Sequence, residues 1–126
     1  MTAQKVLVVE DNEKSMKLFR DVLTATGYCT LEAATGRDAL ELAAEHVPDL
    51  VLMDIQLPDL DGIEALIQLR ADVRTASIPV LALTAQAMLG DRERFLAAGF
   101  DDYISKPVDV VALLGIVRQH CDGARR

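Results

Sequence analysis

The sequence predicts an α/β fold with a doubly wound sheet of five parallel strands and helices on both faces. Three short apolar runs, at residues 6–9, 50–53 and 80–83, are continuous instead of alternating. Such runs are typical of strands that are buried on both faces of a parallel sheet. Helical patterns separate the runs. Five strand–helix repeats in 126 residues are too few to close an eight-stranded barrel, so we expect an open sheet.

In the N-terminal half, the strand at 6–9 is followed by a helix with apolar residues at helical spacing. Gly27 ends this helix, and a weaker strand is predicted at residues 28–33. Thr35 and Asp38 form a capping box that opens a second helix, which extends through Glu45. The residues of these two helices that are expected to face the core are Met16, Phe19, Val22, Leu23, Ala39, Leu40 and Ala43.

In the C-terminal half, Asp61 and Glu64 form a second capping box after the strand at 50–53. A helix is predicted over residues 91–98, where Gly99 ends it, and a weak strand follows at 103–105. Asp109 is the expected N-cap of the last helix. The residues of the third and last helices that are expected to face the core are Ile63, Leu66, Ile67, Leu69, Val110, Leu113, Leu114 and Val117.

The composition indicates one globular domain, which we expect to span residues 1–126 without an output domain. Apolar residues make up 51% and charged residues 26%, as in ordinary globular proteins. The net charge of -7 disfavours binding to nucleic acid or to an anionic membrane surface. No apolar run approaches the roughly 18 residues of a membrane span, and no signal peptide is evident. Cys29 and Cys121 form no CxxC motif, so we expect a cytoplasmic protein with reduced thiols.

Polar side chains are predicted at the carboxyl ends of four strands, where open α/β sheets bind their ligands. These residues are Glu10, Asp11, Asp54, Thr84 and Lys106. Most of them, taken alone, have an ordinary explanation, such as helix capping or a solvated lysine. Asp54 is the exception, because it directly follows a buried strand, where unpaired carboxylates are rare.

The clustered carboxylates predict a site for a hard cation. Three acids at one crevice repel one another unless a cation lies between them. Oxygen ligands without His or Cys select Mg²⁺ before zinc. Lys106 and Thr84 could then hold the oxygens of a phosphoryl group. The pattern therefore predicts phosphoryl transfer with a carboxylate nucleophile.

The chain resembles the receiver domains of two-component response regulators over nearly its whole length. The motifs that carry the resemblance are Glu10-Asp11-Asn12, Leu52-Met53-Asp54, Leu57-Pro58-Asp59-Leu60-Asp61-Gly62, Leu83-Thr84-Ala85 and residues 98–107, which end in Lys106-Pro107. The resemblance implies a flavodoxin-like sheet with strand order 2-1-3-4-5. It also implies that Asp54 accepts a phosphoryl group from a phosphohistidine.

The same resemblance implies roles for the residues around Asp54. Mg²⁺ would be held by Asp11, Asp54 and the backbone carbonyl of Gln56, with Glu10 acting through a metal-bound water, and Mn²⁺ is expected to substitute. The phosphoryl group would be bound by Lys106, Thr84 and Ala85. Thr84 and Tyr103 would be the switch pair, Pro107 would follow a cis peptide bond, and Gln56 and Gln86 would tune dephosphorylation. Phosphorylation would remodel the face formed by the fourth helix, the fifth strand and the fifth helix.

Within the family, the segments around Asp54 and Met88 look like those of single-domain regulators of the DivK type. The expected partners are a sensor histidine kinase or a histidine phosphotransferase and a downstream protein target. We expect a phosphorylation switch, not an enzyme that acts on separate substrates.

Three alternatives stay open at this point. The chain could be a receiver module of a hybrid histidine kinase, in which similar segments occur. It could be a small Mg²⁺-dependent phosphatase that forms an Asp54 aspartyl phosphate, although Gln56 stands where such phosphatases of the haloacid-dehalogenase type have a second Asp. A degenerate receiver used as a scaffold is disfavoured, because the acidic residues, Thr84 and Lys106 are intact.

Overall fold

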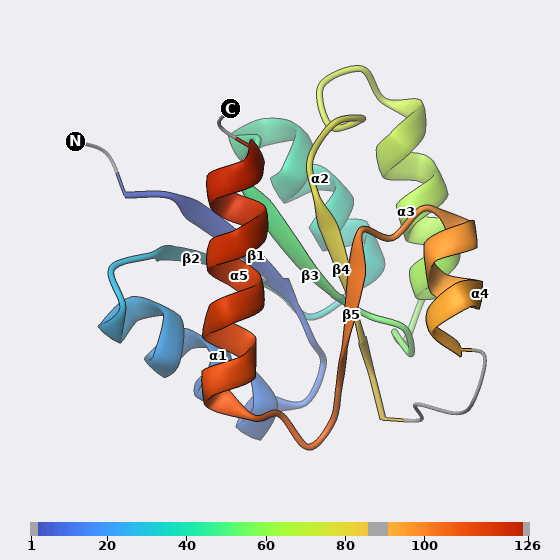
Figure 1. Cartoon of the computed structure of the whole chain (residues 1–126). Coiled ribbons are helices and arrows are strands. Elements are labelled where there is room, and N and C mark those ends of the chain that lie inside the picture. Colours follow the sequence, from blue (N-terminus) through green and yellow to red (C-terminus); the bar gives the residue numbers. More distant parts are fainter. Residues whose placement is uncertain (1–2, 86–90, 125–126) are drawn as a thin grey trace.

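Five parallel strands lie in the order β2-β1-β3-β4-β5 in the computed structural model, which describes residues 3–85 and 91–124 (Figure 1). The strands are β1 (Lys5–Val9), β2 (Cys29–Ala33), β3 (Leu50–Asp54), β4 (Val80–Thr84) and β5 (Asp102–Ser105). The predicted fold class and the strand order are therefore confirmed. The order reverses between β1 and β3, which is where open α/β sheets form their binding crevice.

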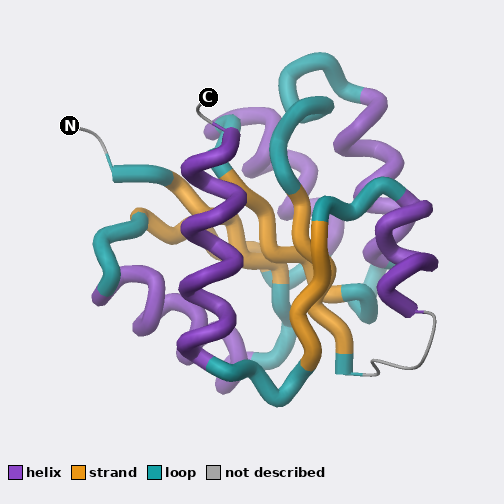
Figure 2. Tube along the Cα trace, in the orientation of Figure 1, coloured by secondary structure: helices purple, strands orange, loops and turns teal. Residues whose placement is uncertain are grey.

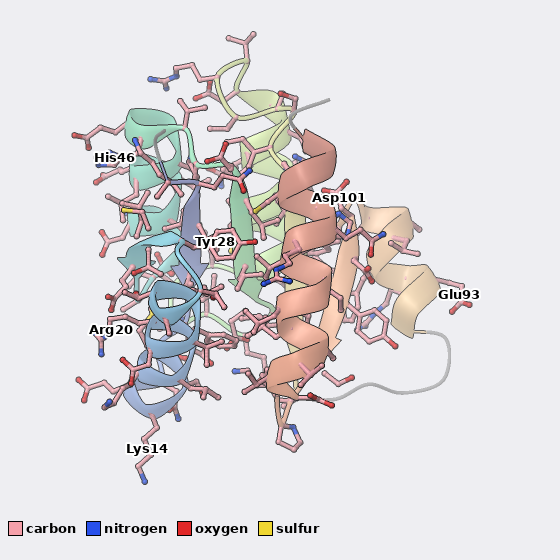
Figure 3. All side chains as sticks on the ribbon, turned by 60° about the vertical axis from the view of Figure 1, so that its left-hand side comes forward. Lys14, Arg20, Tyr28, His46, Glu93 and Asp101 are labelled. Carbon is pink, nitrogen blue, oxygen red and sulfur yellow. The ribbon has the colours of Figure 1, made fainter. Side chains whose placement is uncertain are left out.

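Five helices cover the two faces of the sheet. They are α1 (Glu13–Ala25), α2 (Gly36–His46), α3 (Gly62–Ala71), α4 (Asp91–Ala98) and α5 (Val110–Ala124). Helices α1 and α5 lie on one face, and α2, α3 and α4 lie on the other (Figure 2). Charged side chains such as Lys14 of α1 and Glu93 of α4 project away from the sheet (Figure 3). Within the described residues, no helix combines the length and the apolar composition that a membrane crossing needs.

Polar side chains cap the N-termini of four of these helices. The capping residues are Asn12, Thr35, Asp61 and Asp109, whose side-chain oxygens accept hydrogen bonds from first-turn N–H groups at 2.8–3.1 Å. A cap of this kind stabilises a helix by about 1 kcal/mol. The caps at Thr35, Asp61 and Asp109 were predicted from the sequence, and the four caps together fix how the chain leaves the carboxyl edge of the sheet.

Two apolar clusters form the core, one on each face of the sheet. Phe19 and Leu23 of α1 pack with Val117 of α5, and Phe95 of α4 packs on the opposite face. All four side chains are buried. Each contributes about 1.5–3 kcal/mol through removal of its apolar surface from water. This packing makes the sheet a rigid support for the residues at its carboxyl edge.

Two residues that were expected to face the core are exposed instead. Ile67 is 59% exposed, because the buried residues of α3 repeat at 62, 65, 66 and 69 and Ile67 falls outside that stripe. Val110 is 37% exposed, because it is the first residue of α5 and the buried stripe begins at Leu113. That stripe continues to Cys121, which was not expected in the core.

Candidate functional site

A cavity of about 650 Å³ opens at the carboxyl edge of the sheet. Its wall is made by the ends of four strands, the loop between β3 and α3, and one side chain of α4. The residues that line it are Glu10, Asp11, Asn12, Asp54, Ile55, Gln56, Leu57, Pro58, Asp61, Thr84, Ala85, Arg94 and Lys106. The cavity brings together the polar side chains that the sequence places at four separate strand ends.

Strand register places the two buried acids side by side. Val9 of β1 is paired with Met53 of β3, so the next residues, Glu10 and Asp54, meet at the edge of the sheet. On the other side of Asp54, the backbone N–H of Lys106 donates a hydrogen bond of 2.8 Å to the carbonyl of Thr84. Four neighbouring strands, β1, β3, β4 and β5, therefore fix the relative positions of Glu10, Asp54 and Lys106.

The Lys106 ammonium forms ion pairs with both buried acids. Its Nζ atom contacts Glu10 Oε1 and lies 3.0 Å from Asp54 Oδ2. The Glu10 side chain is 0% exposed and that of Asp54 is 10% exposed. Buried charges are tolerated when they are paired, so Lys106 holds the two acids in place.

The two acids respond to this environment in opposite directions. Burial, with a hydrogen bond to Asp54, raises the pKa of Glu10 from 4.5 to about 7 although Lys106 opposes the shift. Burial also acts to raise the pKa of Asp54, but hydrogen bonds from Glu10, the Gln56 N–H and Lys106 outweigh it and lower that pKa. Asp54 is therefore the acid of the pair that stays ionised to lower pH, and it stays available as a nucleophile.

The donor set fits a hard divalent cation. One ligand oxygen from each of Glu10, Asp11 and Asp54 lies within 4.8 Å of the others. Glu10 Oε2 is buried and accepts no hydrogen bond from the residues that the structure describes. The cluster holds three carboxylates, two of which pair with the Lys106 ammonium, and all its donors are oxygens. This charge excess and donor type suit Mg²⁺ better than a transition metal.

The loop between β3 and α3 approaches the same cavity. The Gln56 N–H donates a hydrogen bond of 2.9 Å to Asp54 Oδ1, and its side chain is exposed. Gln56 also forms an isolated antiparallel bridge with Asp61. The backbone of Gln56 is thereby fixed beside the Asp54 carboxylate, at the position where its carbonyl was expected to serve as a ligand.

Comparison with known proteins identifies this arrangement. The protein-family model described as the response regulator receiver domain matches residues 6–118 of the chain. The chain belongs to the response regulator receiver family. It is thus a component of two-component signalling, in which a receiver is a phosphoryl acceptor that acts between histidine kinases and downstream targets.

The relatives of this receiver include single-domain regulators. The chain is 47% identical over 121 residues to the polar-differentiation response regulators DivK of Brucella ovis and Brucella anthropi, covering 96% of this chain and 98% of each relative. A similar solved structure is the receiver domain of a Pseudomonas aeruginosa sensor histidine kinase, with magnesium coordinated in its active-site cleft. It is 36% identical to this chain and has a TM-score of 0.88. The match covers 96% of this chain and 99% of that chain. A CheY-like receiver from Methanospirillum hungatei has 28% identity, a TM-score of 0.89 and 98% coverage of both chains.

The remaining predicted residues of the receiver lie around the same edge. Thr84 is buried at the end of β4, Ala85 is exposed beside it, and the Lys106–Pro107 peptide bond is cis. Tyr103 is paired with Ala82, two residues before Thr84, so the side chains of Tyr103 and Thr84 lie on the same face of the sheet. The Tyr103 ring is half-buried, with its centroid 6.2 Å from that of Phe95. Gln86, the second residue expected to tune dephosphorylation, lies outside the described residues.

One charged residue of the cavity wall was not expected from the sequence. Arg94 of α4 lines the cavity, and its guanidinium carbon lies 4.8 Å from the centroid of the Phe95 ring. It belongs to a charged run at residues 91–94, which is typical of a solvated helix face. The only signal for Arg94 was its place in the first turn of the helix that follows β4.

Proposed function

We propose that Asp54 accepts a phosphoryl group from a phosphohistidine and that this event switches the contacts of the protein. The observation that carries the proposal is the pairing of Asp54 with Lys106 at 3.0 Å beside Glu10 and Asp11, at the end of a buried strand. An ionised carboxylate in this position can attack phosphorus. The bond between phosphorus and the histidine nitrogen breaks as the bond to an Asp54 oxygen forms, and the nitrogen keeps the electron pair.

Asp11, Asp54 and the backbone carbonyl of Gln56 would hold Mg²⁺, and Glu10 would contribute through a water. The ion, when bound, neutralises the clustered acids and the charge of the transferring group. We expect Mn²⁺ to substitute, because it also prefers oxygen ligands.

The chain's own groups then hold the phosphoryl oxygens. Lys106 is already directed at Asp54 and can donate a charge-assisted hydrogen bond. Thr84 supplies a hydroxyl from β4, and the small Ala85 leaves the phosphoryl group accessible to a partner's histidine. Gln56 and Gln86 are amides that can hydrogen-bond but cannot act as strong bases. We therefore expect slow to moderate self-dephosphorylation that substitutions at Gln56 or Gln86 alter.

We propose that the signal leaves through the face formed by α4, β5 and α5. Thr84 moves toward the phosphoryl oxygens, and Tyr103 turns into the space that Thr84 leaves. The upstream partner is a sensor histidine kinase or a histidine phosphotransferase, and the downstream partner is a protein, not nucleic acid or a membrane. The DivK relatives, which the alignment covers over 98% of their length, support a regulator that signals through contacts of the receiver itself. We place this regulator in the cytoplasm.

Intact mass measurement tests this function. The protein is incubated with acetyl phosphate and Mg²⁺, and the Asp54→Asn variant is treated identically. We expect one phosphate that lasts for minutes on the wild type and none on Asp54→Asn. An equal adduct on the variant would contradict the assignment of Asp54. Rapid turnover of varied phosphomonoesters would instead support a phosphatase, and no adduct on the wild type would support a scaffold.

A further inference from the structure

Asp59 lies in the β3–α3 loop but caps a different helix. Its Oδ1 accepts a hydrogen bond of 2.7 Å from the backbone N–H of Gly36, and its Oδ2 accepts one of 3.0 Å from the N–H of Arg37. Both donors belong to the first turn of α2, more than 20 residues earlier in the chain. Both carboxylate oxygens of Asp59 are thus used to attach its loop to α2.

A close packing contact supports the same attachment. Gly36 is buried, and a Cβ atom placed there would lie 2.9 Å from Cβ of Leu60 and 3.0 Å from its Cδ1. The absence of a side chain at Gly36 lets Leu60 pack directly on the start of α2. The two consecutive residues Asp59 and Leu60 therefore contact α2 by a polar and an apolar interaction.

The other end of the loop is attached to β3. The Gly62 N–H donates a hydrogen bond of 3.0 Å to the carbonyl of Ile55. The bridge between Gln56 and Asp61 closes the loop, and the Gln56 N–H in turn contacts the Asp54 carboxylate at 2.9 Å. A displacement of residues 59–61 would consequently be passed to Gln56 and to the carboxylate of Asp54.

We propose that Asp59 is a positioning residue, which holds the Gln56 backbone and the Asp54 carboxylate in their working geometry by attaching the β3–α3 loop to α2. The proposal rests on the proposed function in that it concerns the same Mg²⁺ and phosphoryl site. Asp59 itself does not line the cavity, so it acts through the loop and not by contact with a ligand.

The electrostatics of Asp59 favour a strong attachment. Two N–H groups at a helix N-terminus bind a carboxylate better than a neutral acceptor, because the hydrogen bonds are charge-assisted and the helix dipole adds to them. Desolvation acts to raise the pKa of Asp59, but the hydrogen bonds from Gly36 and Arg37 outweigh it and lower this pKa. The attachment is therefore intact throughout the neutral pH range.

The chain offers a matched control for a test. Thr35 caps the same helix end, where its hydroxyl oxygen accepts a hydrogen bond of 3.1 Å from the N–H of Asp38. Thr35→Ala and Asp59→Ala both remove a capping acceptor from α2, but only Asp59→Ala frees the loop. Asp59→Asn keeps one acceptor oxygen and loses the charge, so its effect should be intermediate.

The experiment measures Mg²⁺ affinity by titration and hydrogen exchange of the Gln56 and Gly62 amides in the metal-free protein. We expect Asp59→Ala to weaken Mg²⁺ binding about tenfold, the lower end of the effect of removing a group that orients metal ligands. We also expect faster exchange of both amides in Asp59→Ala, an intermediate result for Asp59→Asn, and wild-type behaviour of the site in Thr35→Ala.

Equal effects of Asp59→Ala and Thr35→Ala would overturn the positioning role. They would show that the weaker Mg²⁺ binding and faster amide exchange result from a less stable α2. Wild-type exchange and affinity in Asp59→Ala would overturn it as well. If the wild type itself bound no Mg²⁺, the proposed function would fail, while the exchange data on the metal-free protein would still decide whether Asp59 holds the loop. Should Asp59→Ala not fold, the comparison is made with Asp59→Asn.

Discussion

Lys106 Nζ lies 3.0 Å from Asp54 Oδ2, although the two residues are 52 positions apart in the chain. The same ammonium contacts Glu10, so one cation connects the ends of β1, β3 and β5. Before phosphorylation this cation compensates buried carboxylates. Under the proposed function, the same cation would bind the new phosphoryl oxygens after phosphorylation. The stability of the protein and its chemistry would then depend on one side chain.

The first prediction concerns the loss of this cation. Lys106→Met should lower the free energy of unfolding by about 1–3 kcal/mol in metal-free buffer, because it leaves two buried acids without their counter-charge. Mg²⁺ should recover more stability in Lys106→Met than in the wild type, since a cation then replaces the missing ammonium. Urea unfolding with and without Mg²⁺ measures both effects.

Lys17→Met is the matched control for this measurement. Lys17 pairs with Asp21 at 2.7 Å, but both side chains are more than half exposed. Exposed pairs of this kind contribute about 0.2–0.5 kcal/mol. If Lys106→Met were as stable as Lys17→Met at every Mg²⁺ concentration, the compensating role of Lys106 would be wrong.

The second prediction is a pH dependence that Glu10 causes. The pKa of Glu10 is about 7 in the folded protein, whereas the ordinary pKa of a glutamate side chain is 4.5. Between these values the folded state binds more protons than the unfolded state, so stability should fall as the pH rises through this range. In metal-free buffer, Glu10→Gln should be more stable than the wild type by about 1–3 kcal/mol at pH 8 and similar to it near pH 5.

Urea unfolding across this pH range, with EDTA present, provides the measurement. Gln is a suitable replacement because it has the size of protonated Glu and can donate a hydrogen bond to Asp54. A stability difference between Glu10→Gln and the wild type that did not change with pH would refute the raised pKa of Glu10.

Local patterns in the sequence predicted the sheet, its strand ends and the helix caps. Continuous apolar runs show that a strand is buried on both faces, and a short polar residue before a helix has few roles other than a cap. The acids and Lys106 could be placed at one edge because parallel strands share a carboxyl edge.

Contacts between distant parts of the chain could not be read in this way. The exposure of Ile67 depends on which residues of α3 meet the sheet, and a local apolar pattern does not determine this. The attachment of Asp59 to α2 is likewise a contact between a loop and a helix separated by more than 20 residues. The sequence marks this contact only by the acidic residue in Pro58-Asp59-Leu60, and such a segment is equally consistent with an ordinary turn.

The third prediction concerns the coupling between Thr84 and Tyr103. Phosphorylation adds about -1.5 to -2 charge and three acceptor oxygens near Thr84. Thr84→Ala should still be phosphorylated at Asp54 but should lose the movement of Tyr103 and phosphate-dependent partner binding. Thr84→Ser retains the hydroxyl and should retain the response.

The chain has two tyrosines and no tryptophan, which makes the readout simple. Tyr103 lies on the α4 side of the sheet, and Tyr28 packs with the α1–α5 cluster on the other side (Figure 3). NMR signals of the Tyr103 ring should shift on phosphorylation while those of Tyr28 stay constant. If phosphorylation moved the Tyr103 signals in Thr84→Ala as far as in the wild type, the coupling would not pass through Thr84.

The last prediction compares two glycines in helices. A Cβ atom at Gly62 would lie 2.7 Å from the carbonyl oxygen of Asp54 and 2.8 Å from Cα of Ile55, which are both backbone atoms that cannot rotate away. Gly62→Ala must therefore displace either α3 or the end of β3, at a cost of about 1–3 kcal/mol. Since the backbone of Asp54 forms one side of this contact, phosphorylation by acetyl phosphate should slow as well. At Gly115 in α5 a Cβ atom meets nothing within 4 Å, so Gly115→Ala should stabilise the protein by about 0.5–1 kcal/mol and leave phosphorylation unchanged.

Thermal unfolding and the rate of mass gain on incubation with acetyl phosphate measure both variants. If Gly62→Ala behaved like Gly115→Ala in both assays, the close approach of α3 to the Asp54 backbone would have no part in holding the site.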